Sequence, residues 1–290
     1  MPYNEWITTH PVIPPHLLER IPLLADGTPG DALFAQHPGA GQKGLGGLPE
    51  GFNLRRPDWV QATHAAFFQA GARALRTNSA QANAVMLGAL GLDERCEAIN
   101  NSAMALLRAA VGQQALVMGA IGQIAATTPW PDRERAYAQQ LVYLCDTGTD
   151  FVLLDGFADP EEAVRVLRMA RNAGDAPVLG VLQGDGRGRT PSGPLLVDGI
   201  RQLLAADCDA VGALFPHTFT DLRPLMDTLL ALEAPTAVFV GADAPDALSP
   251  EAYAQRLAPL ADLRVVILGG GRHIGPAHVA ALARRVTPHE

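Results

Sequence analysis

The sequence predicts a single (β/α)8 barrel over residues 1–290. Short apolar, β-branched segments alternate with segments of helical periodicity along the whole chain, and short turns join them. Several of the helical segments begin at a proline, which suits the first turn of a helix. In a chain of 290 residues this alternation favours one closed barrel, and a doubly wound open sheet is the alternative.

The elements follow one another in strand-then-helix order. Residues 1–20 contain several prolines and predict an irregular lead-in, the first strand is expected at 21–25, and residues 38–52 are glycine-rich and predict an irregular loop of the lid or binding type. The later strands are expected at 74–77, 115–120, 151–154, 177–182, 210–215, 236–240 and 265–268. The helices are expected at 57–70, 81–90, 93–111, 131–147, 160–174, 194–206, 221–232, 250–260 and 276–286.

Composition and charge exclude several classes of function. Acidic residues outnumber basic ones by 30 to 22, giving a net charge of −8, so nucleic acid is not an expected partner. No apolar run approaches the roughly 20 residues that span a bilayer, and the N-terminus does not resemble a secretion signal, so we expect a cytoplasmic protein without a membrane partner. Cys96, Cys145 and Cys208 lie far apart and are expected to be buried and inert.

Two carboxylates mark the predicted site. In a barrel the active site forms from the loops that follow the strands, and Asp26 and Asp155 each come at such a position. Their strands stand on different sides of the barrel, so both carboxylates could reach one cationic group of a ligand, such as an amine. The Thr77-Asn78 turn is expected nearby. The alternative for each aspartate is a structural role in capping a turn or helix.

The last strand is followed by glycines and a basic residue. The backbone N–H groups of Gly270 and Gly271, with the Arg272 side chain, are suited to a carboxylate or phosphate, and the alternative is a tight turn with a solvated arginine. His217 and His273 also follow strands and are candidates for a base or a metal ligand. Their alternative is an exposed loop histidine, since two histidines without a carboxylate at metal-binding spacing are a poor signature.

Many of these segments resemble the homocysteine S-methyltransferases, whose barrel also forms the first module of cobalamin-dependent methionine synthase. The resemblance covers most of the chain and is carried by these segments in this order: Asp26-Gly27, 56–64, 70–72, Thr77-Asn78-Ser79, Ala82-Asn83, Gly91-Leu92, Asn100, 119–122, 153–155, Glu162-Ala163, Gly212, Gly269-Gly270 and 276–279. It implies the same fold and a pocket for a small amino acid, with Asp26 and Asp155 on its amino group.

The resemblance breaks at the zinc ligands. In that family three cysteines hold a zinc ion that binds the sulfur of homocysteine and stabilises its thiolate. The corresponding positions here are Phe215, Gly271 and Arg272, none of which ligates zinc. We therefore expect no zinc and predict no other cofactor. Asp155-Gly156 also replaces the family's glutamate-threonine, and Gly122-Gln123 replaces its glycine-proline.

Three hypotheses for function follow. The first is a homocysteine S-methyltransferase-like protein that binds a small amino acid or thiol with altered chemistry, in which Arg272, His273 and His217 are the catalytic candidates. A methyl-carrying protein is a candidate partner, because no corrinoid or folate module is recognisable in the chain. The second is a non-catalytic amino-acid-binding or regulatory subunit. The third is a barrel enzyme of another class that binds an anionic substrate at residues 269–272.

Overall fold

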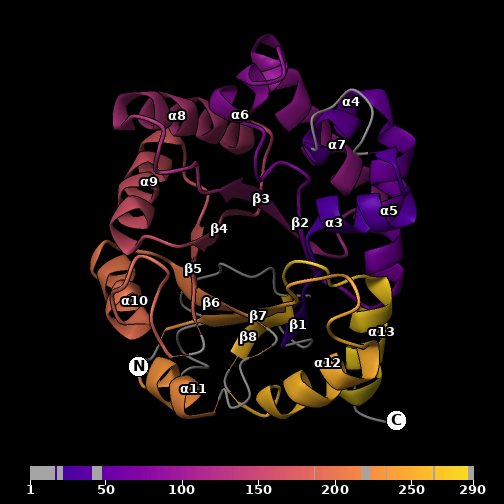
Figure 1. Ribbon diagram of the computed structural model, residues 1–290, viewed down its shortest axis with the longest axis vertical. Coiled ribbons are helices and arrows are strands. Elements are labelled where there is room, and N and C mark those ends of the chain that lie inside the picture. The colour runs from indigo at the N-terminus through magenta and orange to yellow at the C-terminus, as the bar shows by residue number, and fades with distance from the viewer. Residues whose placement is uncertain are drawn as a thin grey trace.

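The strands form a ring that is surrounded by helices (Figure 1). A computed structural model of the protein describes residues 17, 22–40, 48–185, 187–216, 218, 223–232, 234–263 and 265–286. Its eight strands are β1 (Leu23–Leu24), β2 (Ala74–Arg76), β3 (Leu116–Gly122), β4 (Phe151–Phe157), β5 (Val178–Gln183), β6 (Ala210–Pro216), β7 (Thr236–Gly241) and β8 (Val265–Gly270). The predicted (β/α)8 barrel is confirmed.

All strands run parallel, in the order β1-β8-β7-β6-β5-β4-β3-β2. The ring closes between β1 and β2 through a bridge from Ala25 to Ala74. Two backbone hydrogen bonds support this closure, from Arg73 N–H to Leu24 O at 2.7 Å and from Asp26 N–H to Ala74 O at 3.2 Å. Parallel closure brings the carboxyl ends of all strands to one mouth, where the predicted site residues lie.

The helices that follow the strands form the outer layer (Figure 1). They are α3 (Pro29–Gln36), α4 (Phe52–Arg55), α5 (Pro57–Gln69), α6 (Ala84–Gly88), α7 (Cys96–Val111), α8 (Trp130–Asp146), α9 (Pro160–Ala173), α10 (Leu196–Ala205), α11 (Arg223–Leu230), α12 (Pro250–Leu257) and α13 (Pro276–Val286). Proline stands in the first turn of α3, α5, α8, α9 and α12, where its missing N–H costs nothing.

The core has two parts, because successive strand residues point to opposite faces. On β3, Leu116 and Met118 belong to the cluster that fills the barrel interior, whereas Val117 and Ile121 face the helices. β4 alternates in the same way. A residue two positions from an interior residue therefore also faces the interior, and this alternation determines which side chains reach the mouth.

The segment between β1 and β2 differs from the prediction. The sequence predicted an irregular loop at 38–52 and no helix between Asp26 and Pro57, but the chain forms α3, a short 3-10 helix at Pro49–Gly51 and α4 there. Pro29 starts α3, and Ala32 and Leu33 bury its inner face. The many glycines of this segment predicted irregular structure. The short helices form there because they pack against the barrel. Residues 41–47 and the lead-in other than Leu17 lie outside the described residues.

Within the described part of the chain, no helix has the length and apolar character needed to cross a membrane.

Candidate functional site

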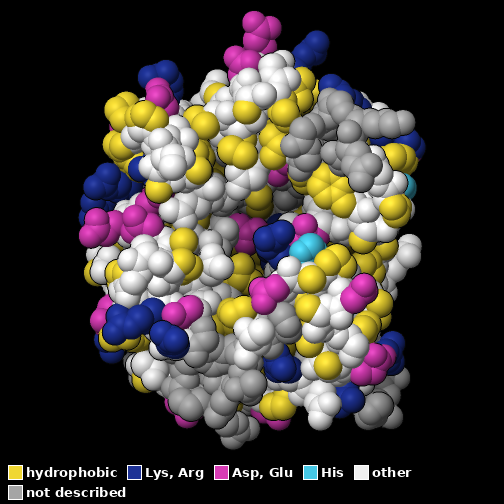
Figure 2. Space-filling model, viewed as in Figure 1, with side chains coloured by type: hydrophobic (Ala, Val, Ile, Leu, Met, Phe, Trp, Pro, Cys, Tyr) yellow, Lys and Arg dark blue, Asp and Glu magenta, His cyan; other side chains and the backbone are white. Residues whose placement is uncertain are grey.

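A hollow lies over the ring of strands, and acidic, basic and histidine side chains surround it (Figure 2). Below such a mouth, the centre of the barrel holds a buried ion-pair cluster. Arg76, at the end of β2, is 2% exposed, Asp26 is fully buried and the Asp155 side chain is 14% exposed. Sequence analysis identified both aspartates but missed the arginine between them.

The Arg76 guanidinium joins four strands or their ends. Its Nε donates to Asp26 Oδ1 at 3.2 Å, its Nη1 donates to both Asp155 oxygens at 3.1 and 3.2 Å, and its Nη2 donates to Gly270 O at 2.8 Å. The guanidinium carbon also lies 5.0 Å from the centroid of the Phe239 ring. The side chain thus crosses the lumen and covers the apolar interior of the barrel.

One cation serves two carboxylates in this cluster. Complete burial raises the pKa of Asp26 to about 7, against the opposing attraction of Arg76. Burial alone would lower the pKa of Arg76, but the charges of Asp155 and Asp26 and their hydrogen bonds raise it. Arg76 therefore stays charged, and Asp26 is the group that takes up or releases a proton near neutral pH.

The predicted Thr77-Asn78 turn lies beside this cluster, where its side chains form hydrogen bonds within the protein. Thr77 Oγ1 accepts from Ala120 N–H at 2.9 Å and lies 2.6 Å from Ser79 Oγ. Asn78 Nδ2 donates to Pro49 O and to Asn53 Oδ1, both at 2.9 Å. The turn therefore ties the 3-10 helix and α4 to the end of β2, and so shapes one wall of the mouth.

Glu50 is a second residue that sequence analysis missed. It is 3% exposed, its Oε1 accepts from Gln81 N–H at 2.9 Å, and its Oε2 has no hydrogen-bond partner. Burial raises the pKa of this carboxyl. The position within a glycine-rich segment gave no sequence signal for burial.

Between pH 5 and pH 9 we expect the free energy of unfolding of Glu50→Gln to increase relative to that of the wild type by on the order of 1 kcal/mol. A raised pKa means that the folded state loses stability when pH rises through that pKa, and glutamine does not ionise. Urea unfolding at both pH values measures the difference.

Glu162→Gln is the matched control. Glu162 is also buried, but its oxygens accept from Tyr137, Gln123 and Arg133 at 2.7 to 2.9 Å. Its amide variant should lose about 1–3 kcal/mol because charged hydrogen bonds are weakened. Equal effects of the two substitutions at pH 9 would contradict our account of Glu50.

The loop after β8 does not present its glycine N–H groups to the solvent. Gly270 N–H donates to Asp26 O at 3.2 Å, and Gly271 N–H donates to Val240 O at 3.0 Å. Arg272 is 70% exposed and its Nε lies 3.8 Å from Asp31 Oδ2. His273 adopts a positive φ of 57°, and its N–H donates to the same Asp31 oxygen at 3.1 Å. Asp31 therefore holds this loop.

The structure therefore separates the predicted site residues into two groups. Asp26, Asp155 and the carbonyl of Gly270 meet at Arg76 in the centre, whereas Arg272 and His273 lie at the rim with Asp31. His217 lies outside the described residues. Arg76 did leave a signal in the sequence, because it is a charged residue inside the strand predicted at 74–77. In the structure it lies two positions from Ala74, which belongs to the interior cluster, and so it faces the lumen.

Close packing joins the loops after β1 and β8. A Cβ placed on Gly27 would lie 1.8 Å from the carbonyl oxygen of Ile274. We expect Gly27→Ala to lower the free energy of unfolding by about 2 kcal/mol, because backbone must move. Gly275→Ala, where a Cβ would meet nothing within 4 Å, is the control for chemical denaturation, and the prediction fails if both variants behave alike.

The three positions at which the resemblance expects zinc cysteines hold Phe215, Gly271 and Arg272. Phe215 is 1% exposed and belongs to the cluster between sheet and helices, where its ring lies near Gly184 and Leu196. Gly271 has no side chain, and a Cβ there would lie 2.5 Å from Leu214. Arg272 is a cation. Over the described residues, no cluster of three or more His, Cys, Asp and Glu side chains is arranged to hold a metal.

The cysteines lie in other parts of the fold. Cys96 and Cys208 are buried as predicted, but Cys145 is only half-buried. The Cys208 thiol donates to the carbonyls of Val178 and Ala210, which begin β5 and β6, so it lies at the opposite end of the barrel from the mouth.

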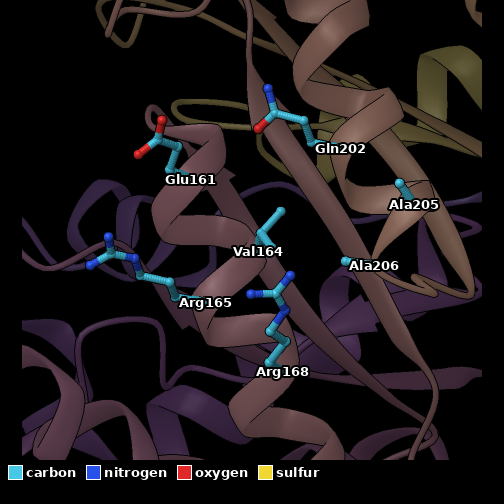
Figure 3. A pocket seen from close by; sticks show the side chains of 7 residues that line it. All are labelled: Glu161, Val164, Arg165, Arg168, Gln202, Ala205 and Ala206. Carbon is cyan, nitrogen blue, oxygen red and sulfur yellow. The ribbon is translucent and has the colours of Figure 1, made fainter.

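A separate groove of about 360 Å³ lies on the outer layer, between α9 and α10 (Figure 3). Val164 lies on the side of α9 next to α10, and the Arg168 side chain runs along α9 (Figure 3). The walls of the groove come from these two helices and the residue that follows α10. Its polar side chains are Glu161, Arg165, Arg168 and Gln202, and Arg165 points away from Gln202 (Figure 3). We therefore assign the candidate site to the mouth.

A parallel barrel whose mouth is built around buried, paired charges defines a (β/α)8-barrel protein with its site at the strand ends. The homocysteine S-methyltransferase family model matches residues 23–286, and the chain belongs to that family. Searching the curated proteins gave no match.

Solved structures share the fold at low sequence identity. The metallated form of homocysteine methyltransferase MmuM from Escherichia coli is 19% identical, with a TM-score of 0.74 over 93% of this chain and 99% of that one. Its apo form is 20% identical, with a TM-score of 0.69 over 93% and 98%. The 3-dehydroquinate dehydratase from Geobacillus kaustophilus is 12% identical, with a TM-score of 0.53 over 92% and 93%.

Proposed function

We propose that this protein is homocysteine S-methyltransferase-like, binds a small thiol or amino-acid ligand at the barrel mouth, and acts without zinc-thiolate chemistry. Family membership and the fold support the location of the site. The observation that carries the altered chemistry is the replacement of all three zinc-ligand positions by Phe215, Gly271 and Arg272. A phenyl ring turned towards the helices, a hydrogen and a guanidinium supply no ligand for a metal.

The ion-pair cluster supports a binding role for the mouth. Three charged side chains in the barrel interior lose much of their hydration, which is expensive compared with an apolar core of the same shape. Proteins retain such losses of stability at sites that bind a ligand. Asp155, at 14% exposed, is the member of the cluster that a ligand in the mouth would meet.

Without zinc, the protein has weaker means of activating a thiol. A free thiol has a pKa of roughly 8.5, and nearby positive charge lowers it less than metal coordination does. Arg272 at the rim is exposed and close to Asp31, so its charge is partly offset there. This observation favours a second candidate function, a non-catalytic binding or regulatory subunit that keeps the pocket.

Metal analysis with ligand screening tests the proposal. We expect purified protein to contain well under one zinc per chain, and at least one of homocysteine, methionine and simple thiols to raise the melting temperature. Stoichiometric zinc, bound tightly enough to survive dialysis against a chelator, would contradict the altered chemistry.

A turnover assay separates the two candidate functions. The protein is incubated with the stabilising thiol and a panel of sulfonium and methyl-corrinoid donors, and the methylated thiol is measured by mass spectrometry. Product above the background reaction supports an enzyme. Ligand binding without product for any donor supports the binding subunit.

A further inference from the structure

Every nitrogen of the Arg76 guanidinium donates a hydrogen bond inside the protein. Nε contacts Asp26, Nη1 contacts both oxygens of Asp155, and Nη2 contacts the carbonyl of Gly270. The backbone N–H of Arg76 adds a bond of 3.1 Å to Asp26 Oδ2. With Arg76 present, both oxygens of Asp26 and both oxygens of Asp155 therefore have a partner from this chain.

Two carboxylates that converge from β1 and β4 form a receptor for one cation. An ammonium group has three donors and a single charge, and so has the means to satisfy the same oxygens. In this protein the cation already present is part of the chain. A ligand amine would have to displace a guanidinium that is 2% exposed and also bound to Gly270 O and to the Phe239 ring.

We propose that Arg76 occupies the place of a ligand's ammonium group, so that the mouth selects small thiols without a free amino group. This inference rests on the proposed function in one respect, namely that the mouth binds a small ligand. It narrows the two ligand classes named above to one. A neutral or anionic thiol leaves the cluster intact, whereas an amino acid brings a second cation to carboxylates that are already paired, which discriminates against it.

The selectivity of the wild-type protein is the first test. Homocysteine and 4-mercaptobutanoate differ only by the amino group, and isothermal titration calorimetry gives both affinities under reducing conditions. We expect 4-mercaptobutanoate to bind at least about tenfold more tightly. Equal affinities, or tighter binding of homocysteine, would overturn the inference.

Arg76→Ala is the second test, because it opens the place of the guanidinium while leaving both carboxylates. Ethylguanidine is the part of the side chain that this substitution removes. We expect ethylguanidine and ethylammonium to raise the melting temperature of Arg76→Ala by several degrees, and the preference between the two thiols to reverse in favour of homocysteine. Arg168→Ala, which removes an exposed arginine from α9, is the matched control and should respond to neither cation.

The two tests separate this inference from the proposed function. If the wild type binds neither thiol, the proposed function fails, and the two cations alone decide the inference. A larger rise in melting temperature for Arg76→Ala than for both the wild type and Arg168→Ala then supports the inference, and equal rises for the three proteins overturn it. If Arg76→Ala does not fold alone, recovery of folded protein when ethylguanidine is present during refolding supports the inference. If it folds under neither condition, wild-type selectivity decides.

Discussion

Replacing Arg76 by methionine is expected to lower the free energy of unfolding by on the order of 3–5 kcal/mol at pH 8. Methionine fills part of the same volume but leaves Asp26 fully buried beside Asp155 with no cation. Removing one partner of a buried pair is costly because the charge that remains is neither hydrated nor paired. Urea unfolding followed by circular dichroism measures the loss.

The size of this effect should depend on pH and on the partner. At pH 5 Asp26 can take up a proton, so the loss should be smaller than at pH 8. Adding Asp26→Asn to Arg76→Met should recover part of the lost stability by removing the unpaired charge. A double-mutant cycle with no coupling between these positions would contradict the ion-pair assignment.

Arg108→Met is the control for this prediction. Arg108 pairs with Asp150 at 3.1 Å, but their side chains are 26% and 28% exposed. Water and salt screen such a pair, so we expect a loss of less than about 1 kcal/mol. Similar losses for Arg76→Met and Arg108→Met would mean that burial of the Arg76 cluster contributes little to the free energy of unfolding.

Protonation of His64 is expected to lower the free energy of unfolding by roughly 3 kcal/mol when pH falls from about 6.5 to about 4. This histidine on α5 is fully buried, and neither ring nitrogen has a hydrogen-bond partner. Burial lowers its pKa from 6.5 to about 4. Because the unfolded chain binds the proton more tightly than the folded chain, the stabilising effect is present above pH 6.5 and is lost as the solution becomes acidic.

The contribution of His64 is best measured as a difference between variants. His64→Leu and His64→Gln both remove the titration, and comparing them separates it from the polarity of the side chain. Both variants should lose less stability than the wild type between pH 6.5 and pH 4, since Asp26 and other groups titrate alike in all three. Parallel pH profiles for the three proteins would show that His64 is not buried in its neutral form.

The periodicity of the sequence was enough to predict the barrel. The alternation of β-branched segments with helical ones is a local pattern of residues a few positions apart, so it can be recognised from the sequence alone. The same local reasoning placed Asp26 and Asp155 near the carboxyl ends of their strands, although β4 continues past Asp155 to Phe157. It failed for α3 and α4, because short helices in a glycine-rich segment form only when they pack against the barrel.

Tertiary structure alone decided which charges meet. Asp26, Arg76 and Asp155 are separated by 50 and 79 residues, and nothing local indicates that one guanidinium reaches both carboxylates. The alternation of strand faces turns Arg76 and Asp155 into the lumen, and closure of the ring between β1 and β2 brings Asp26, which follows β1, beside Arg76. The sequence by itself therefore determined the fold and the end of the barrel that carries the site. The packing of the closed barrel determined that the cation between the two aspartates belongs to the protein.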